Sequence, residues 1–597
     1  MAEYHNPQQE PGTERKLLLV FALTFLAIML FQTVFKKYLP QPPEAKPTSS
    51  QAQNQTASQP ATAGAVSNAA ASATGTAIAG TKQASSESEI VIENDLYRIV
   101  FNNRGAQVKS WVLKKYTDDK EKPLELVNPV AAPKYGYPLS LWTYDENLRN
   151  KLNSALYVDS SDRAPGATLS APAEIVFEYA DGDVAVRKAF KFDHTYVVDV
   201  STSVRVKGSE VTAFPMWPEG FGDQSTAATF AASQIAYQND GKVERLANGW
   251  TLLPAIKAGG GTTIQGPFDW AAVSDQYFAA VFMPQDPQSA ALVTLRNQIE
   301  IPHNPSDSSD TKRDRVDVYG AAVGSLKGST TERLFVGPKA LPVLESVHVP
   351  GITGADPDLR AIVDFGWLGY IARPLFLWLK WTYNHIVANW GWAIVIQTLF
   401  INLALLPLRL TQMKSMLKMQ RVAPQIKAIQ EKYKKYSLRD PRKAEMNQEV
   451  SALYKKEGVN PAGGCLPLLI QMPFLFAYYR MLGVAIDLRH APWLWIHDLS
   501  SPELGQIHVL PILVIVSMLF MQRMTPQAGM DPAQQKMMNI MMPGMLGIIS
   551  WNLASGLCLY WSVGNLIGIV QQAIMNRTKL GREMREMMEK RARKKEK

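Results

Sequence analysis

Cysteine is nearly absent from this chain, and its scarcity narrows the possible chemistry. Only Cys465 and Cys558 occur among 597 residues, and both lie in apolar segments. A disulfide framework and a thiolate-bound metal site are therefore excluded, and both cysteines are expected to be packing residues. The sequence also has no glycine-rich phosphate-binding motif, so no bound nucleotide is expected to drive its activity.

Length and charge divide the chain into unlike parts. A chain of 597 residues is too long to fold around one compact core. Its overall content of 19% charged residues is the average of a soluble part and a membrane part. The net charge of +9 comes from 62 basic and 53 acidic residues. A nucleic-acid-binding domain would carry such an excess on one folded face. Here it is concentrated in two blocks, residues 411–458 and 576–597, each beside an apolar segment.

Apolar segments predict six membrane spans. The first, at residues 17–36, lacks a small-residue cleavage site and is expected to be an uncleaved anchor after a cytoplasmic N-terminus, residues 1–16. Cytoplasmic segments of membrane proteins are enriched in lysine and arginine, so both basic blocks are expected to face the cytoplasm. The region between the first two spans is then expected to lie on the other side of the membrane. The other five spans form a core over residues 390–575, namely 390–408, 464–486, 509–522, 537–553 and 557–575.

The long region after the anchor has two compositions. Residues 37–87 are mainly small and polar and predict a flexible linker. Residues 88–344 carry short β-branched and aromatic runs between turn residues, which predict one large antiparallel β-sandwich domain on the side of the membrane away from the cytoplasm. The expected strands include Ile90–Ile92, Tyr97–Phe101, Tyr196–Val200 and Ala291–Leu295.

An aromatic segment follows the β domain, at residues 356–386. It is too interrupted by charged residues and proline to span a membrane. It predicts an amphipathic helix lying in the outer interface of the membrane. Packing against the β domain is the alternative.

Two histidines of the β domain have acidic neighbours in the sequence. His194 lies beside Asp193, and His303 is followed by Asp307 and Asp310. Neither spacing is diagnostic of acid–base catalysis or metal binding. Exposed turn residues are the simpler interpretation, so no catalytic or metal-binding residue is predicted.

The first basic block, residues 411–458, predicts a cytoplasmic helical hairpin. Pro424 is expected to kink its first helix. The second helix is expected to have Asp440 as its N-cap, Pro441 at its first position and Gly458 past its end. Such a block is either a solvated face that fixes topology or a docking surface for acidic headgroups, RNA or a protein, and the sequence favours neither.

An ordered set of motifs runs from the hairpin to the C-terminus. With the basic tail, residues 576–597, this set resembles the YidC family of membrane protein insertases over the whole helical core. The anchor, linker and β domain are similar in order and size to those of Gram-negative members, whose periplasmic domain is a sugar-mutarotase-like sandwich. The motifs are Asn-Pro-Ala-Gly-Gly-Cys-Leu-Pro-Leu-Leu-Ile-Gln-Met-Pro at 460–473, Ile-His-Asp-Leu at 496–499, Asp-Pro-Ala-Gln-Gln-Lys at 531–536, Ser555-Gly556-Leu557, Tyr560, Asn565 and Gln571-Gln572.

The resemblance implies a membrane protein insertase and chaperone in the bacterial inner membrane, which is not an enzyme and uses no cofactor. Its substrates would be nascent membrane proteins, whose polar part enters a hydrophilic groove open to the cytoplasm and to lipid. The implied partners are the Sec translocon (SecYEG and SecDF), the ribosome through the basic tail and the hairpin, the signal recognition particle receptor, and membrane lipids.

Polar residues inside the predicted spans indicate where such a groove would lie. Several fall about 9 to 12 Å from the cytoplasmic ends of their spans, at a rise of 1.5 Å per residue. Buried polar groups in hydrocarbon should face one another or water, so they predict a hydrated cavity, with isolated interhelical hydrogen bonds as the alternative. The predicted groove residues are Gln397, Thr398, Asn402, Gln471, Ser517, Tyr560, Trp561, Asn565 and Gln571.

One position departs from the family pattern. Asn402 stands where the family characteristically has an arginine that makes the groove positive. Asparagine is a donor without charge, so the attraction of acidic substrate tails is in doubt here, whereas a hydrated groove is not. Arg480 lies about 24 Å from the cytoplasmic end of its span and is expected to reach the periplasmic interface instead.

Two other functions fit parts of the sequence. A small-solute transporter or channel would need charged or coordinating residues near mid-membrane and usually paired halves. Neither is evident. A membrane-anchored carbohydrate enzyme would place its chemistry in the β domain.

Overall fold

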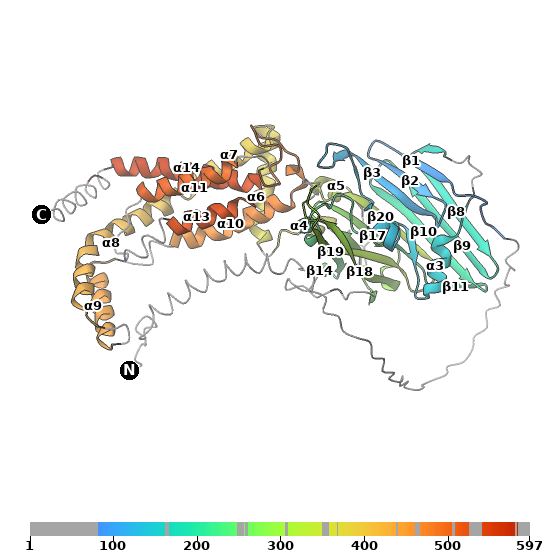
Figure 1. Ribbon diagram of the computed structural model, residues 1–597, viewed down its shortest axis with the longest axis horizontal. Coiled ribbons are helices and arrows are strands. Elements are labelled where there is room, and N and C mark those ends of the chain that lie inside the picture. Colours follow the sequence, from blue (N-terminus) through green and yellow to red (C-terminus); the bar gives the residue numbers. More distant parts are fainter. Residues whose placement is uncertain are drawn as a thin grey trace. The chain divides into compact units, whose positions relative to one another are not determined.

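The computed structural model divides the chain into two compact units, which meet in the sequence between Ile362 and Val363. The first is built from strands and the second from helices (Figure 1). The predicted anchor and most of the predicted linker lie outside the described residues. The structure describes residues 81–160, 166–246, 256, 261–304, 309–348, 358–366, 368–436, 440–459, 466–503, 508–524, 540–578 and 582.

The strands of the first unit form three sheets. The largest has ten strands, with β11 (Ser209–Val211) beside β10 at its margin. In spatial order its other strands are β14 (Lys242–Leu246), β13 (Gln234–Asn239), β16 (Trp270–Ser274), β17 (Phe278–Pro284), β20 (Thr330–Pro338), β10 (Val197–Val206), β9 (Val184–Phe192), β8 (Ala173–Asp181) and β6 (Val158–Asp159).

Two five-stranded sheets complete the unit. One has the order β4 (Pro123–Glu125), β3 (Gln107–Thr117), β2 (Tyr97–Asn102), β1 (Glu89–Glu93) and β7 (Thr168–Ser170). The other has the order β15 (Thr262–Gln265), β18 (Ala290–Pro302), β19 (Arg313–Ser325), β12 (Phe214–Trp217) and β5 (Ser140–Trp142). Short helices connect the strands: α2 (Ala132–Tyr135), α3 (Glu146–Ser154), α4 (Ala227–Ala231), η1 (Pro287–Ser289), α5 (Leu341–Glu345) and η2 (Leu359–Ile362).

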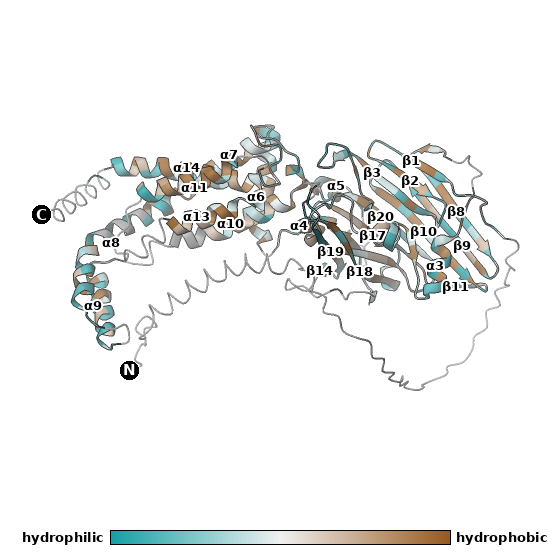
Figure 2. Ribbon diagram, viewed as in Figure 1, coloured by the Kyte–Doolittle hydropathy of each residue, from teal (hydrophilic) through white to brown (hydrophobic). Residues whose placement is uncertain are grey.

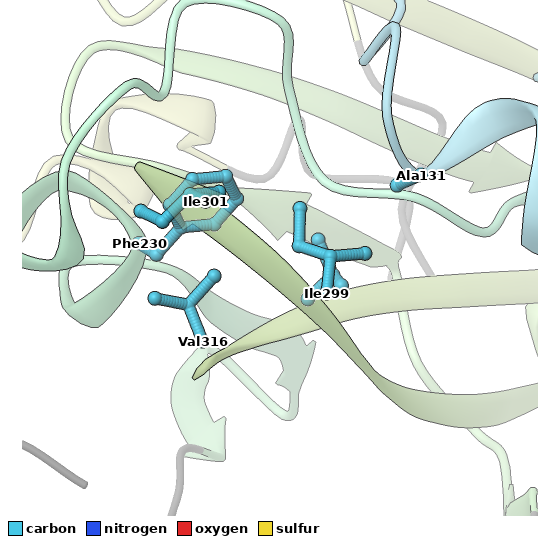
Figure 3. Close-up of a cluster of buried hydrophobic side chains, with 6 residues drawn as sticks. Ala131, Phe230, Ile299, Ile301 and Val316 are labelled. Atoms are coloured by element: carbon cyan, nitrogen blue, oxygen red, sulfur yellow. The ribbon is translucent and has the colours of Figure 1, made fainter. Parts of the chain in front are cut away.

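Aromatic side chains join the sheets face to face. The ring of Phe101 on β2 lies 4.9 Å from that of Phe190 on β9, and the ring of Trp111 on β3 lies 5.9 Å from that of Trp217 on β12. A separate apolar cluster packs α4 and Ala131 against β18 and β19 (Figure 3). Burial of such rings is the main stabilising term for a sandwich.

The four predicted strands are confirmed, and two of them extend well beyond the predicted runs. Val197 begins a strand of ten residues, and Ala290 begins a strand of 13 residues that pairs with β19 along its whole length. The predicted antiparallel character needs one correction, because β1 and β7 pair in parallel. β7 reaches β1 after the chain has left the sheet and returned through α3 and β6, which allows it to run in the same direction.

The acidic neighbours of His194 and His303 form no site among the described residues, and Asp307 lies outside them. Asp193 accepts hydrogen bonds from the backbone N–H and the hydroxyl of Thr195, as a turn residue does. His303 lies 2.9 Å from Asp314, and both side chains are substantially exposed. The described residues contain no group of three or more histidine, cysteine, aspartate or glutamate side chains able to hold a metal ion.

The inner face of the largest sheet carries one carboxyl without a partner. Glu332 on β20 is 1% exposed, and neither of its carboxyl oxygens has a hydrogen-bond partner in the described structure. Burial raises the pKa of Glu332 well above its ordinary value, because the charged form is poorly solvated there. The folded domain therefore holds a proton that the unfolded chain releases.

Glu332→Gln should remove a pH dependence of stability. Above the ordinary glutamate pKa of 4.5, the wild-type domain should lose about 1.4 kcal/mol of unfolding free energy per pH unit from this group, because the unfolded chain binds fewer protons. The variant should lack this slope and be more stable at neutral pH. Melting temperatures of the purified protein between pH 5 and 8 measure the difference. The exposed Glu300→Gln is the control, and an unchanged slope in Glu332→Gln would contradict the assignment.

The second unit is a set of helices. Figure 2 shows hydrophobic residues along α11 and α14 and hydrophilic ones along α9. Apolar side chains such as Val516, Val570 and Ile574 are more than half exposed, as expected of surfaces that face lipid. The elements are α6 (Gly369–His385), α7 (Trp390–Ala404), α8 (Leu406–Lys432), α9 (Arg442–Lys456), α10 (Leu466–Val484), η4 (Ile486–Leu488), α11 (Val509–Met524), α13 (Met542–Ser550) and α14 (Ser555–Arg577).

Membrane-spanning length is evident for few of these helices. Among the described residues, α14 is long and apolar enough to cross a membrane by length and composition. The bent pair formed by α7 and the start of α8 is a second candidate, and α11 is a shorter apolar helix. The count of six spans therefore stays a prediction.

The predicted span at residues 390–408 contains a bend near its C-terminal end, and its crossing of a membrane stays a prediction. α7 ends at Ala404, and α8 begins two residues later at an angle of 51° to it. The cause is Pro407, which has no N–H to continue the α7 ladder and suits the first turn of a new helix. The first turns of α8 consequently point in a direction that a straight span would not give.

The predicted hairpin is present as α8 and α9. Gly458 follows α9 with φ of +59°, as predicted for a residue past a helix end. Asp440 accepts a hydrogen bond from the N–H of Arg442, although α9 begins one residue later than predicted. α8 continues through Pro424 rather than ending there. The two helices pack through Val422, Ile426 and Val459, with Met419, Val450, Leu453 and Tyr454 around them.

The predicted interfacial segment contains η2 and α6, whereas residues 349–357 lie outside the description. Lys380 of α6 pairs with Asp487 at 3.0 Å, and the ring of Trp378 lies 6.3 Å from Phe400 of α7. α6 therefore packs on the helices of its own unit. Tyr370 and Trp381 remain at least half exposed, so a position in the membrane interface stays the prediction.

Candidate functional site

Polar side chains lie along one face of α14, and we name them, with their partners, the polar seam. Tyr560, Gly564, Gly568 and Gln571 are spaced by three or four residues and so share one face of the helix, with Asn565 beside them. The two glycines leave this face without side chains at two points. The polar seam comprises Gln397, Thr398, Asn402, Arg409, Tyr478, Ser517, Tyr560, Asn565 and Gln571.

At the end nearest the start of α14, the seam is closed by stacked rings. The ring of Tyr478 on α10 lies 4.1 Å from that of Tyr560. The Tyr478 hydroxyl donates to Oε1 of Gln397 at 2.8 Å, and the amide of Gln397 donates to the carbonyl of Leu375 on α6. Gln397 is fully buried, so this network joins three helices around it.

The middle of the seam consists of two pairs. Asn402 on α7 donates from Nδ2 to the carbonyl of Thr398, one turn earlier, and lies opposite Gly564. Asn565 donates from Nδ2 to Oγ of Ser517 on α11 at 3.0 Å. All four residues are buried. Their hydrogen bonds satisfy groups that would otherwise be unpaired in an apolar bundle.

The other end of the seam holds an arginine. Arg409, in the first turn of α8, donates from Nη1 to Oε1 of Gln571 at 2.6 Å. A Cβ added at Gly568 would lie 2.9 Å from both this Nη1 and the sulfur of Met521. The guanidinium therefore lies against α14 and close to α11, in space that only a glycine leaves open.

The structure thus brings most of the predicted groove residues into one seam, although not at one level. Ser517 meets Asn565, whereas Gln571 lies six residues further along α14 and bonds Arg409. Trp561 is half-buried beside Tyr560. The side chain of Gln471 lies outside the described part of the structure.

Sequence reasoning missed Arg409 and Tyr478. The first core span was predicted to end at residue 408, one residue before Arg409, and the bend at Leu405 is what directs Arg409 to α14. Pro407 and the glycine at 568 were the available signals. Tyr478 had a weaker one, since it lies seven residues after Gln471 and so on the same face of α10.

Arg480 of α10 belongs to a separate ion pair, and its position at the periplasmic interface stays a prediction. It pairs with Asp364 at 2.9 Å and also donates to the carbonyl of that residue. Gly366, with φ of +69°, allows this approach, because an added Cβ would lie 3.1 Å from Nε of Arg480. The pair fastens the segment before α6 to α10.

The N-terminal ends of α7 and α11 are fastened by one loop. Trp493 packs so closely on Gly391 that an added Cβ would lie 2.1 Å from its ring. Glu503 accepts hydrogen bonds from the indole of Trp495 and from the N–H of Leu510, in the first turn of α11. This loop therefore covers the end of the helical unit opposite Arg409.

Comparison with known proteins gives concordant sequence matches. The family model of the YidC periplasmic domain matches residues 89–378, and that of the 60Kd inner membrane protein matches residues 381–582. The membrane protein insertase YidC of Syntrophus aciditrophicus is 30% identical over 582 residues, covering 94% of this chain and 99% of that protein. The membrane protein insertase YidC of Geobacter metallireducens is also 30% identical, and the alignment covers 95% of this chain and 98% of that protein.

Solved structures give a looser match. A crystal structure of an active YidC insertase with the first transmembrane domain resolved is 20% identical, and the alignment covers 84% of this chain and 95% of that chain. Its TM-score is 0.33. The sequence matches define the relationship.

Proposed function

Because this chain belongs to the YidC family of membrane protein insertases, we propose that it inserts nascent membrane proteins into the bacterial inner membrane through the polar seam, and assists their folding as a chaperone. The observation that supports this route is the continuous face of α14, which lines up hydrogen-bonding groups from α7, α8 and α11. Relatives are named for insertion, which is not an enzymatic reaction.

The proposed topology follows from charge and from the seam. α8 and α9 would face the cytoplasm, because the block 411–458 has 12 basic and five acidic residues. Arg409 would then lie at the cytoplasmic end of the seam, and the loop with Trp493 at the periplasmic end. The N- and C-termini would be cytoplasmic, the β domain periplasmic, and the six spans as predicted.

The proposed mechanism is a shortened hydrocarbon path. A polar tail loses its hydration when it enters lipid, at a cost of several kcal/mol for each unpaired group. The seam offers amides and hydroxyls that are bonded either between helices, as Asn565 is to Ser517, or within one helix, as Asn402 is to Thr398. A client could replace these bonds group by group. Its apolar segment would meanwhile move along exposed α11 and α14 into the bilayer. No nucleotide step is required by this route.

The proposed partners follow from the two basic blocks. The tail 576–597 and the hairpin would contact the ribosome, and anionic membrane lipids could share the same cations. Cooperation with the Sec translocon, and delivery through the signal recognition particle receptor, are proposed from the family relationship.

Reconstitution tests the proposed function and the seam together. Purified protein in liposomes should insert a client with a short polar tail, measured as protease protection of that tail. Asn565→Leu should reduce the yield about fivefold, because it removes a polar contact and leaves Ser517 without its partner. Leu566→Val, at a lipid-exposed neighbour, is the matched control. Equal yields from protein-containing and empty liposomes would refute the function.

A thiol introduced at position 402 should report hydration of the seam. In a chain without Cys465 and Cys558, Asn402→Cys should react with a membrane-impermeant thiol reagent added from the cytoplasmic side, because water enters from that end. A bound client should slow the labelling severalfold. Ile394→Cys, buried two turns earlier on α7, is the control expected to stay unreactive. If the Asn402→Cys variant is inert in every condition, the seam is a dry contact between helices.

A further inference from the structure

The loop between η4 and α11 contains an exposed apolar turn. Trp493 and Ile496 exchange two backbone hydrogen bonds of 2.8 Å, so Leu494 and Trp495 form a two-residue turn between them. Leu494 is 64% exposed and Trp495 is 46% exposed, whereas Trp493 and Ile496 are buried. We name residues 492–496 the apolar tip, because none of these five residues carries a charge.

Leu494 combines two features that are unfavourable in water. Its φ is +50°, in the left-handed region that two-residue turns usually fill with glycine, asparagine or aspartate. Its apolar side chain is also mostly exposed at the apex of the turn. A backbone outlier that presents an apolar side chain is grounds for a functional hypothesis, because neither backbone preference nor packing accounts for it.

Indole rings surround the base of the apolar tip. The ring of Trp493 lies 5.5 Å from that of Trp392 on α7 and 5.8 Å from that of Trp495. Indoles are enriched at membrane–water interfaces, where their rings meet lipid and their N–H groups meet polar headgroups. Ionisable residues flank the tip on both sides, at 489–490 and 497–498. This order of ionisable flanks, indoles and apolar apex suits a segment that enters lipid from the aqueous side.

The loop that carries the apolar tip also holds the N-terminal ends of three helices. Besides its contacts with α7 and α11, its carbonyls at Leu499 and Ser501 accept hydrogen bonds of 2.8 and 2.7 Å from the N–H groups of Gly556 and Ser555 in α14. These bonds satisfy N–H groups that the start of a helix leaves free. Three helices of the polar seam therefore share one point of attachment, and whatever holds the tip fixes the depth of all three.

We propose that the apolar tip inserts into the periplasmic leaflet of the bilayer, with Leu494 among the acyl chains and the indoles at headgroup level, and thereby sets the depth of the polar seam. Lipid suits the tip better than a protein partner, because the tip has no charged side chain for specific pairing. The starts of α7 and α11 also expose apolar side chains, namely Trp392, Val509 and Ile512. This inference rests on the topology proposed for the insertase.

Fluorescence quenching in vesicles tests the position of the tip. In the full-length chain without Cys465 and Cys558, Leu494→Cys is labelled with an NBD fluorophore and reconstituted in phosphatidylethanolamine and phosphatidylglycerol. Lipid spin-labelled at carbon 5 should quench the label about threefold more than iodide present on both faces of the vesicle. Glu300→Cys, exposed on β18, is the control and should show the reverse order. Stronger quenching by iodide at position 494 would place the tip in water, and protection from both quenchers would place it under protein; either result would overturn the proposal.

Two substitutions of Leu494 separate lipid contact from folding. Asparagine tolerates the left-handed region, so Leu494→Asn should keep or raise the melting temperature in detergent, while the yield of client insertion falls about threefold. Leu494→Met keeps an apolar side chain and should leave the yield near that of the wild type. An undiminished yield in Leu494→Asn, or a melting temperature that falls with the yield, would overturn the role of the tip. Failure of the insertase function is distinguishable, since wild-type protein would then insert no client, whereas the quenching measurement requires none.

Discussion

Replacing Lys188 by methionine is expected to lower the unfolding free energy of the β domain by about 3 to 5 kcal/mol, because three buried carbonyls would lose their donor. Lys188 on β9 is fully buried, and its Nζ donates to the carbonyls of Gly105, Ala106 and Leu139 at 2.6 to 3.0 Å. Methionine would fill the space of the stem but could not satisfy these acceptors.

The acceptors explain why this lysine has more than a local effect. Gly105, Ala106 and Leu139 have φ of +71°, +44° and +63°. The last two are not glycines, so each adopts the left-handed region at a cost of about 1 to 2 kcal/mol. One lysine side chain therefore holds the turn between β2 and β3 and the entry to β5 in conformations that they would otherwise avoid.

The pH dependence of stability gives a second readout for Lys188. Burial lowers the pKa of Lys188 to about 7 from 10.5. Between these values the unfolded chain binds a proton that the folded domain has released, so unfolding free energy should rise with pH. Lys188→Met should lack this rise. Lys191→Met, an exposed change on the same strand, should cost less than about 1 kcal/mol and keep it.

Thermal and denaturant unfolding of the purified protein measure the loss of unfolding free energy and its pH dependence. Hydrogen exchange of the backbone amides of β9 and β10 is the probe of unfolding. A loss below about 1 kcal/mol in Lys188→Met would show that water or backbone rearrangement replaces the lysine. A pH profile equal to that of the wild type would show that Lys188 stays protonated in the folded domain.

Strands were predictable because alternation is a local property. The runs beginning at Ile90 and Tyr97 alternate with turn residues and lie in strands of nearly the predicted length. The same alternation places Lys188 between Val186 and Phe190 on one face of β9. A charge on an apolar face is thus visible in the sequence, although its three carbonyl partners, distant in sequence, are not.

The polar seam was predictable in composition more than in geometry. The distance of each residue from the end of a straight span predicted Asn402, Ser517 and Gln571 as groove residues, and the structure places all three in the polar seam. Depth could not show that Ser517 pairs with Asn565. It also missed Arg409, because a bend of 51° at one residue redirects the side chain of the next turn. Pro407 marks where such a bend can occur, but a residue count along a straight span does not give its direction.

Removal of the basic tail is expected to have the largest effect on partner binding. The tail, residues 576–597, holds ten basic and four acidic residues, and most of it lies outside the described residues. It begins five residues after Gln571, or about 7.5 Å of helix. A ribosome held there would release its nascent chain beside the cytoplasmic end of the polar seam.

A chain ending at Met575 should therefore bind ribosomes far more weakly than the full-length protein in co-sedimentation from detergent. If about six of the ten cations contact RNA phosphates, affinity of the full-length protein should fall on the order of 10³-fold between 50 and 200 mM salt. The truncated chain should show a much shallower dependence. A tail of equal length with its lysines and arginines replaced by glutamine separates charge from length and should behave like the truncation. Binding that persists with the neutral tail would assign the contact to the hairpin of α8 and α9, whose cations would then be the ribosome-binding surface. Binding that does not change with salt would exclude an electrostatic contact by either basic block.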